Sequence, residues 1–170
     1  MNVELRTVLR WILVVSVTLV VQVGLVTDLR VYGVHPDLLL LLAVCAGIEG
    51  GPGRGAVLGF SCGLLFDLFL PGPFGMTALA YAVTGYVAGL VGDTVVRPAR
   101  WISIGLVTLC SAGGMLLYAG LGQLLGQRSL ADPRLGAIVG IVAATNALLS
   151  LPALAVCRWA DHDPVRARLR

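Results

Sequence analysis

Six apolar segments, separated by short turn-forming stretches, follow one another along this chain of 170 residues. They comprise residues 11–27, 36–48, 54–70, 74–96, 101–125 and 135–157. A helix that crosses about 30 Å of hydrocarbon needs about 20 residues, which the first, fourth, fifth and sixth segments meet or approach. The second is short, so it either borrows flanking residues or turns into the third below the membrane interface. The pattern predicts an all-α, polytopic membrane protein of about six transmembrane helices.

The composition agrees with a lipid environment. Hydrophobic residues make up 58% of the chain and charged residues 12%, about half of the roughly 25% that is usual in soluble domains. A soluble domain of this size cannot bury that much apolar surface. The net charge of +3 is small, and no basic run is interleaved with aromatic residues, so nucleic acid is excluded as an expected partner.

All loops are too short for a domain outside the membrane. We therefore expect one six-helix domain over residues 11–157, preceded by a cytoplasmic N-terminus (1–10) and followed by a basic cytoplasmic tail (158–170). This orientation follows from an excess of positive charge on the cytoplasmic side. Nine arginines would lie inside (Arg6, Arg10, Arg54, Arg97, Arg100, Arg158, Arg166, Arg168 and Arg170) and three outside (Arg30, Arg128 and Arg134).

A glycine repeat is the strongest local pattern. Glycine recurs every four residues at Gly47, Gly51, Gly55, Gly59 and Gly63, and the next position in the series is Asp67. Small residues at this spacing let two helix backbones approach closely in lipid. Two interpretations stay open: packing within this chain, or docking of a helix from another protein. The pair Gly85 and Gly89 has the same spacing.

Asp67 is the most unusual charge, because it lies within the apolar run of residues 64–70. A charge at membrane depth costs several kcal/mol, so such a residue usually faces the bundle interior or a partner. The alternative is that Asp67, only four residues before Pro71, lies near the outer interface and is partly hydrated.

Proline and glycine mark the ends of the segments. Pro36 and Asp37 begin the second segment, where proline suits the first helical turn and a carboxylate complements the helix dipole. Pro52 lies in a glycine-rich turn that ends the second segment. Gly75 is the last residue of the turn between the third and fourth segments.

Several polar side chains are expected to pair locally. Glu49 and Arg54 flank the glycine-rich turn, so we expect that they form an ion pair. Asp93 is expected to pair with Arg97, four residues later. Asn146, in the middle of the sixth segment, is expected to bridge two helices.

Catalytic and metal-binding motifs are not found in the sequence. The two histidines, His35 and His162, fall on opposite sides of the predicted membrane, and neither has a ligand partner at a suitable spacing. The four cysteines form no CxxC pair. The chain is therefore not expected to be an enzyme or to bind a cofactor.

A group of motifs extends from the second segment into the fourth. They are Pro36-Asp37 before a leucine run, Gly51-Pro52…Gly55, Gly59-Phe60…Gly63-Leu64…Asp67, Gly75…Ala78-Leu79…Tyr81, and Gly85-Tyr86-Val87-Ala88-Gly89. Together with the chain length and the six apolar segments, these motifs resemble the family of the bacterial rod shape-determining protein MreD.

This resemblance implies a non-enzymatic scaffold of the cell-elongation complex, which builds the peptidoglycan side wall, in the bacterial inner membrane. The implied partners are an MreC-like bitopic membrane protein, the cytoskeletal MreB, a transpeptidase and a glycosyltransferase. The implied fold is similar to the six-helix S-component of vitamin transporters. The alternative function is therefore a substrate-binding membrane subunit of such a transporter, and the candidates for its binding groups are Glu49, Asp67, Gln123 and Asn146. Homo-oligomerisation is left open.

Overall fold

The computed structural model describes residues 3–26, 36–70, 72–94, 100–126 and 135–161. These residues form six α-helices and one short π-helical turn, and they contain no strand. The elements are α1 (Val3–Val21), η1 (Gln22–Val26), α2 (Leu38–Gly50), α3 (Pro52–Asp67), α4 (Met76–Thr94), α5 (Arg100–Leu124) and α6 (Leu135–Asp161). The predicted all-α class and the predicted number of helices are confirmed.

Three stretches of helix are long and apolar enough to cross a membrane. They are Leu5–Gly24, Trp101–Leu124 and Leu135–Asp161. Helix α2, with 13 residues, extends only about 20 Å, and α3, with 16 residues, about 24 Å. The described residues therefore show three candidate spans and a shorter apolar helix, rather than six helices of full membrane length.

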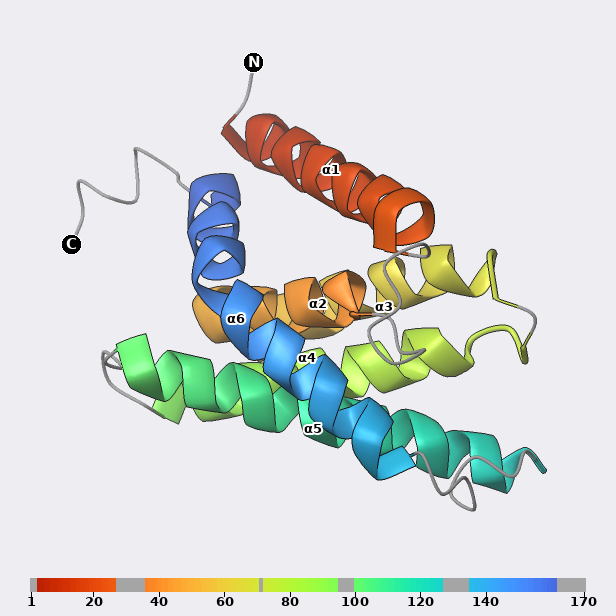
Figure 1. Cartoon of the computed structure of the whole chain (residues 1–170). Helices are drawn as coiled ribbons and strands as arrows, with labels where there is room; N and C mark the ends of the chain where they lie inside the picture. The colour runs from red at the N-terminus through yellow and green to blue at the C-terminus, as the bar shows by residue number, and fades with distance from the viewer. Residues whose placement is uncertain (1–2, 27–35, 71, 95–99, 127–134, 162–170) are drawn as a thin grey trace.

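Helix α2 lies at the centre of the bundle. All nine residues from Leu39 to Gly47 are buried. A helix that is apolar on every side needs to be surrounded, and α2 contacts each of the other five α-helices. Figure 1 shows α2 between α1 on one side and α4 and α5 on the other. The hydrophobic core of the protein is thus built around α2.

Successive helices run in opposite directions, so their ends gather at two opposite ends of the bundle. Polar contacts are found at both. Trp11, early in α1, contacts Asp161, the last residue of α6. Arg54, in the first turn of α3, contacts the same Asp161. We call this end, where α1 and α3 begin and α2 and α6 finish, the Asp161 end. The opposite end, where α2 and α4 begin and α3 finishes, is the Asp67 end.

Helix α6 is the longest helix and contains Pro152. A proline inside a helix removes one backbone hydrogen bond and usually bends the helix. Figure 1 shows that the α6 ribbon changes direction partway along its length. This shape lets α6 pack on α5 with one half while its C-terminal end reaches α1 and α2.

Candidate functional site

At the Asp67 end, the carboxylate of Asp67 joins two helices. Asp67 is the last residue of α3, and only 7% of it is exposed. Its Oδ2 accepts hydrogen bonds from the backbone N–H groups of Gly75 at 2.8 Å and Ala78 at 3.4 Å, and its Oδ1 accepts one from Thr77 at 3.3 Å. These donors belong to the start of α4, where N–H groups lack helical partners and a negative charge is favourable. Asp67 is therefore a buried cap for α4 rather than a hydrated side chain.

Asp37 has a similar role one helix away. Its Oδ1 accepts a hydrogen bond from the backbone N–H of Leu40 at 2.9 Å, which makes it the N-cap of α2. The hydroxyl of Tyr81, from α4, donates a hydrogen bond to Oδ2 of the same carboxylate. Both side chains are buried. The helix start that the sequence predicts at Pro36 and Asp37 thus also links α2 to α4.

Gln22 connects α1 to the start of α2. It lies in the π-helical turn η1 and is almost fully buried. Its Nε2 donates to the carbonyl of Pro36 at 3.0 Å, and its Oε1 accepts from the N–H of Leu38 at 2.9 Å. Sequence reasoning missed Gln22, because it is a single polar residue in an apolar run with no motif around it. Tyr81 belongs to the motif Gly75…Ala78-Leu79…Tyr81, but nothing in that motif indicated Asp37 as its partner.

A cavity of about 270 Å³ lies between these residues. Its walls come from several helices and are mostly apolar; the lining residues are Gln22, Pro36, Asp37, Phe66, Leu70, Thr77, Tyr81, Met115, Tyr118, Ile138 and Val142. The polar side chains of Gln22, Asp37 and Tyr81 are already engaged in the contacts between helices described above. The cavity is close to the lower limit of about 300 Å³ for small-molecule sites.

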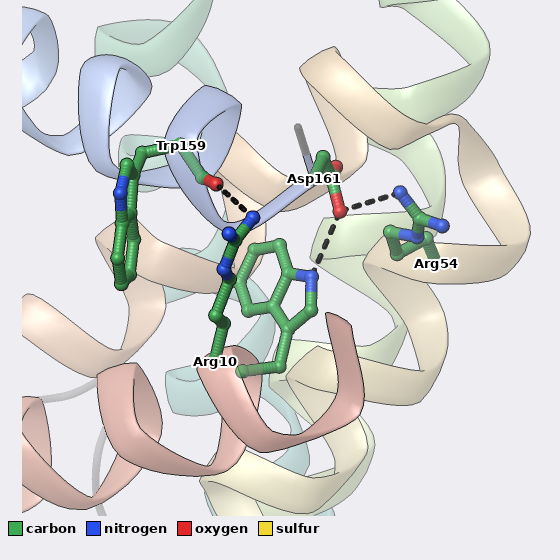
Figure 2. Close-up of polar contacts among 5 residues, drawn as sticks. Arg10, Arg54, Trp159 and Asp161 are labelled. Carbon is green, nitrogen blue, oxygen red and sulfur yellow. Dashed lines mark hydrogen bonds and ion pairs between the residues drawn. The ribbon is translucent and has the colours of Figure 1, made fainter. Parts of the chain in front are cut away.

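At the opposite end, Asp161 holds three helices together (Figure 2). Its Oδ1 accepts a hydrogen bond from the indole Nε1 of Trp11 at 2.8 Å and lies 2.6 Å from Nη1 of Arg54. Its Oδ2 is buried and has no hydrogen-bond partner among the described residues. A single carboxylate oxygen thus connects α1, α3 and α6.

A second contact between α1 and α6 lies beside the first. The guanidinium of Arg10 stands 5.2 Å from the centre of the Trp159 ring, and its Nη1 donates to the Trp159 carbonyl at 3.3 Å. Figure 2 shows Arg10 beside the Trp159 ring. A cation at this distance is attracted to the electron-rich face of the ring.

The predicted ion pair between Glu49 and Arg54 is wrong. Arg54 pairs with Asp161, and Glu49 instead accepts from Nη2 of Arg158 at 2.8 Å. The cause is the C-terminal end of α6, which brings one acidic and one basic residue to the turn between α2 and α3. The proposed partner of Asp93, Arg97, lies outside the described residues.

The glycines of α3 face the backbone of α4. A Cβ atom placed on Gly55 would lie 2.2 Å from the carbonyl oxygen of Gly85, and one on Gly59 would lie 2.3 Å from that of Tyr81. On Gly63, it would lie 2.5 Å from Cα of Ala78. Real Cβ atoms essentially never approach this closely, so only glycine fits. Within this chain α4 therefore occupies the face that these glycines present.

The same close approach extends to α2 and to the turn after it. A Cβ on Gly47 would lie 2.3 Å from the carbonyl oxygen of Gly85, and one on Gly89 would lie 2.4 Å from the backbone of Pro52. Gly51 has a φ of +83° between α2 and α3, which favours glycine because it lacks a side chain. Gly75, with a φ of +93°, makes the corresponding turn before α4.

In the middle of the bundle, Asn146 bridges α6 and α5, as expected from its position. Its Nδ2 donates to the hydroxyl of Ser111 at 3.1 Å, and both residues are fully buried. Its Oδ1 has no hydrogen-bond partner among the described residues. If Oδ1 and Nδ2 of Asn146 exchanged places, Nδ2 instead of Oδ1 would lack a hydrogen-bond partner, because only one side of the amide faces Ser111.

Among the described residues, no three His, Cys, Asp or Glu side chains are grouped so that they could hold a metal ion. The carboxylates that connect helices are divided between the two ends of the bundle. Asp37 and Asp67 lie at one end of the bundle, and Asp161 lies at the other.

A family model described as rod shape-determining protein MreD matches residues 4–145. The chain belongs to the MreD family. The match covers most of the chain and extends through α5 into α6, beyond the last motif that carries the resemblance, at Gly89. Trp159 and Asp161 lie after the matched segment. The search of the curated proteins and that of the solved structures each found no match. Membership in the MreD family supports a role in rod shape determination, and the apolar helices support a location in a membrane.

Proposed function

We propose that this MreD-family protein is a non-enzymatic scaffold of the cell-elongation complex in the bacterial inner membrane. In this role it binds an MreC-like bitopic partner and thereby connects MreB with the transpeptidase and glycosyltransferase that extend the side wall. The family match supports the role in rod shape determination. The specific partners follow from the resemblance to the family.

The observation that carries the scaffold role is how the buried polar groups are used. Asp37 and Asp67 each cap a helix, and Asp161 joins α1, α3 and α6. A catalytic or substrate-binding site needs polar groups that converge on one point in a pocket. Here these groups instead fix helices against one another, as expected of a rigid framework that presents surfaces to other proteins.

We further propose that the Asp161 end faces the cytoplasm. Arg6, Arg10, Arg54 and Arg158 belong to this end, and cytoplasmic edges of membrane helices are enriched in basic residues. Trp11 and Trp159 lie there too, as interfacial tryptophans do. A reporter enzyme that is active only outside the cytoplasm is expected to stay inactive when it is fused after residue 170. An active fusion would contradict this orientation.

The alternative is a substrate-binding membrane subunit of a vitamin transporter with an S-component-like fold. The cavity of about 270 Å³ at the Asp67 end favours it. However, two of its candidate groups, Glu49 and Asp67, lie at opposite ends of the bundle, and Asn146 is buried against Ser111. The scaffold therefore has the stronger support.

Depletion and affinity purification in the native cell separate the two functions. Loss of this protein is expected to turn rods into round cells, and the tagged protein is expected to retain an MreC-like membrane partner in detergent. Co-purification of an ATPase module, or depleted cells that stay rod-shaped while losing uptake of a vitamin, would favour the transporter. A tagged Leu148→Ala variant is a suitable control, because Leu148 is highly exposed on α6.

A further inference from the structure

We propose that the groove between α1 and α3 binds an anionic phospholipid, with an acyl chain along the groove and the phosphate at Arg54. This lipid site goes beyond the scaffold function and does not depend on it. The groove has a volume of about 440 Å³, compared with about 270 Å³ for the cavity at the Asp67 end.

The walls of the groove suit a hydrocarbon chain. Most are aliphatic side chains, with Val8, Ile12 and Val15 from α1 opposite Val57, Leu58 and Leu65 from α3. Val57 is 66% exposed and Ile12 is 56% exposed, so the groove is open along its side rather than enclosed. In a bilayer an apolar groove of this kind faces lipid, and water gains no hydrogen bonds by filling it.

The length of the groove matches one leaflet of a bilayer. On α3 the lining extends from Arg54 to Leu65, which are eleven positions apart, or about 16 Å along the helix. Half of a hydrocarbon core of about 30 Å is about 15 Å. A chain that enters at the membrane interface beside Arg54 would therefore reach the middle of the bilayer near Leu65.

The polar end of the groove suits an anion. Arg54 lines this end, and its side chain is 38% exposed. Its contact with Asp161 uses Nη1, whereas a guanidinium carries five N–H donors that suit phosphate oxygens. The remaining donors can face a headgroup while the ion pair stays intact.

A second observation at the same end also favours negative charge. Helix α3 begins there, and its N-cap, Gly51, provides no side-chain hydrogen bond to the first turn. The dipole of a helix attracts phosphate to its start, where the Asp93 carboxylate also lies, 3.6 Å from the place of a Cβ atom on Gly51. Trp11 also lines this end of the groove, and tryptophan side chains prefer the depth of the headgroups. Arg54, the start of α3 and Trp11 thus place the headgroup at one point.

The test is quenching of Trp11 fluorescence by brominated lipids. The full chain is placed in nanodiscs after Trp101→Phe and Trp159→Phe substitution, so that only Trp11 emits. Brominated phosphatidylglycerol is compared with brominated phosphatidylcholine in a background of unlabelled lipid. One unpaired arginine near an anionic surface contributes about a fivefold preference. Because Arg54 is paired with Asp161, we expect phosphatidylglycerol to quench at a mole fraction lower by at most about fivefold.

Two variants locate the site. Arg54→Gln removes the charge and is expected to reduce the preference to about onefold. Ser61→Phe places a ring in the groove, leaves Arg54 and Asp161 unchanged, and is expected to weaken quenching by both lipids. Leu148→Phe, on the exposed face of α6, is the control and should behave like the parent protein.

Equal quenching by both lipids in the parent protein would overturn the proposal, and so would undiminished quenching in Ser61→Phe. A partner helix is another candidate occupant of the groove. If Ser61→Phe abolishes co-purification of the membrane partner while the parent protein shows no preference for phosphatidylglycerol, the groove is a protein-docking site and the lipid proposal is wrong.

Discussion

The indole nitrogen of Trp11 donates a hydrogen bond to Asp161 at 2.8 Å, although the two residues are 150 positions apart in the chain. This contact joins the beginning of α1 to the last residue of α6, and Arg54 of α3 completes it from the other side. The first and the last helix of the sequence are therefore joined through Asp161, the same residue that holds α3.

Asp161→Ala should destabilise the protein more than Trp11→Phe. The first change leaves both the Arg54 guanidinium and the Trp11 indole without their shared acceptor, whereas the second removes one donor. An unsatisfied buried group such as the Trp11 indole costs about 1–3 kcal/mol, and the Arg54 guanidinium adds less than a buried charge would, because 38% of its side chain is exposed. Thermal unfolding in detergent measures both. Equal midpoints for the two variants would show that the Arg54 contact contributes nothing.

Gly59→Leu and Gly63→Leu should prevent α3 from packing on α4. Even the first carbon of a new side chain would lie within 2.3 Å or 2.5 Å of the α4 backbone. Overpacking typically costs about 1–3 kcal/mol, and a backbone contact leaves little room for relaxation. We expect a lower yield of folded protein, measured by size-exclusion chromatography, and loss of partner co-purification.

Gly140→Leu is the matched control for these two variants. It is also a helical glycine, but a Cβ there would meet nothing within 4 Å. Its yield and elution profile should match those of the parent protein. If all three variants behave alike, close helix packing is not the cause of the defect.

Comparing Asp67→Asn with Asp67→Leu should separate the effect of the negative charge on stability from the effect of the hydrogen bonds that cap α4. Asparagine keeps one oxygen that can accept from the N–H groups of Gly75 or Thr77, whereas leucine keeps none. Loss of an N-cap costs about 1 kcal/mol. We expect Asp67→Leu to insert into the membrane, because the change removes a costly charge, but to unfold at lower temperature and to restore rod shape poorly in depleted cells. Full rescue by Asp67→Leu would count against any role for the carboxylate.

Tyr81→Phe should weaken the connection between α4 and α2. The change removes only the hydroxyl that donates to Asp37, and the ring still fills its place. A hydrogen bond within a protein contributes about 0.5–1.5 kcal/mol. Tyr86→Phe, on a half-exposed tyrosine of the same helix, should unfold at the same temperature as the parent protein. A Tyr81→Phe protein as stable as the Tyr86→Phe control would mean that the bond to Asp37 adds no net stability.

Replacing Asn146 and Ser111 together should be neutral or stabilising. Asn146→Leu alone leaves the Ser111 hydroxyl without its partner, but adding Ser111→Ala removes the remaining polar group. Exchange of a buried hydrogen-bonded pair for apolar groups of similar shape is often nearly neutral, and here it also removes an unpaired oxygen. Unfolding of the double variant in detergent, compared with both single variants, provides the measurement.

The helices themselves could be predicted because each apolar segment ends at a local signal. Helix α3 begins at Pro52 and ends at Asp67, close to the predicted residues 54–70. Helix α5 differs by one residue at each end from the predicted 101–125. The first helix was the exception. It begins at Val3, whereas the apolar run begins at Trp11, because arginines outside the hydrocarbon are compatible with a helix.

The contacts between helices could be predicted only where they are local or repeated. The four-residue glycine period indicated close packing, and the position of Asp37 indicated a helix start. The choice of Asp161 as the partner of Arg54 had no sequence signal, because it depends on where α6 ends in space. The short distance in sequence between Glu49 and Arg54 favoured that pair instead, but in the folded protein Glu49 pairs with Arg158.

The shortness of α2 affects how the protein is made. A segment of about 20 Å cannot match a hydrocarbon layer of about 30 Å by itself, so in isolation it strains the surrounding lipid. Its partners α3 and α4 leave the ribosome later, and the glycine contacts at Gly47 and Gly85 can form only then. The centre of the folded protein is thus completed after synthesis has passed α4, and a nascent chain that stops earlier has no stable core.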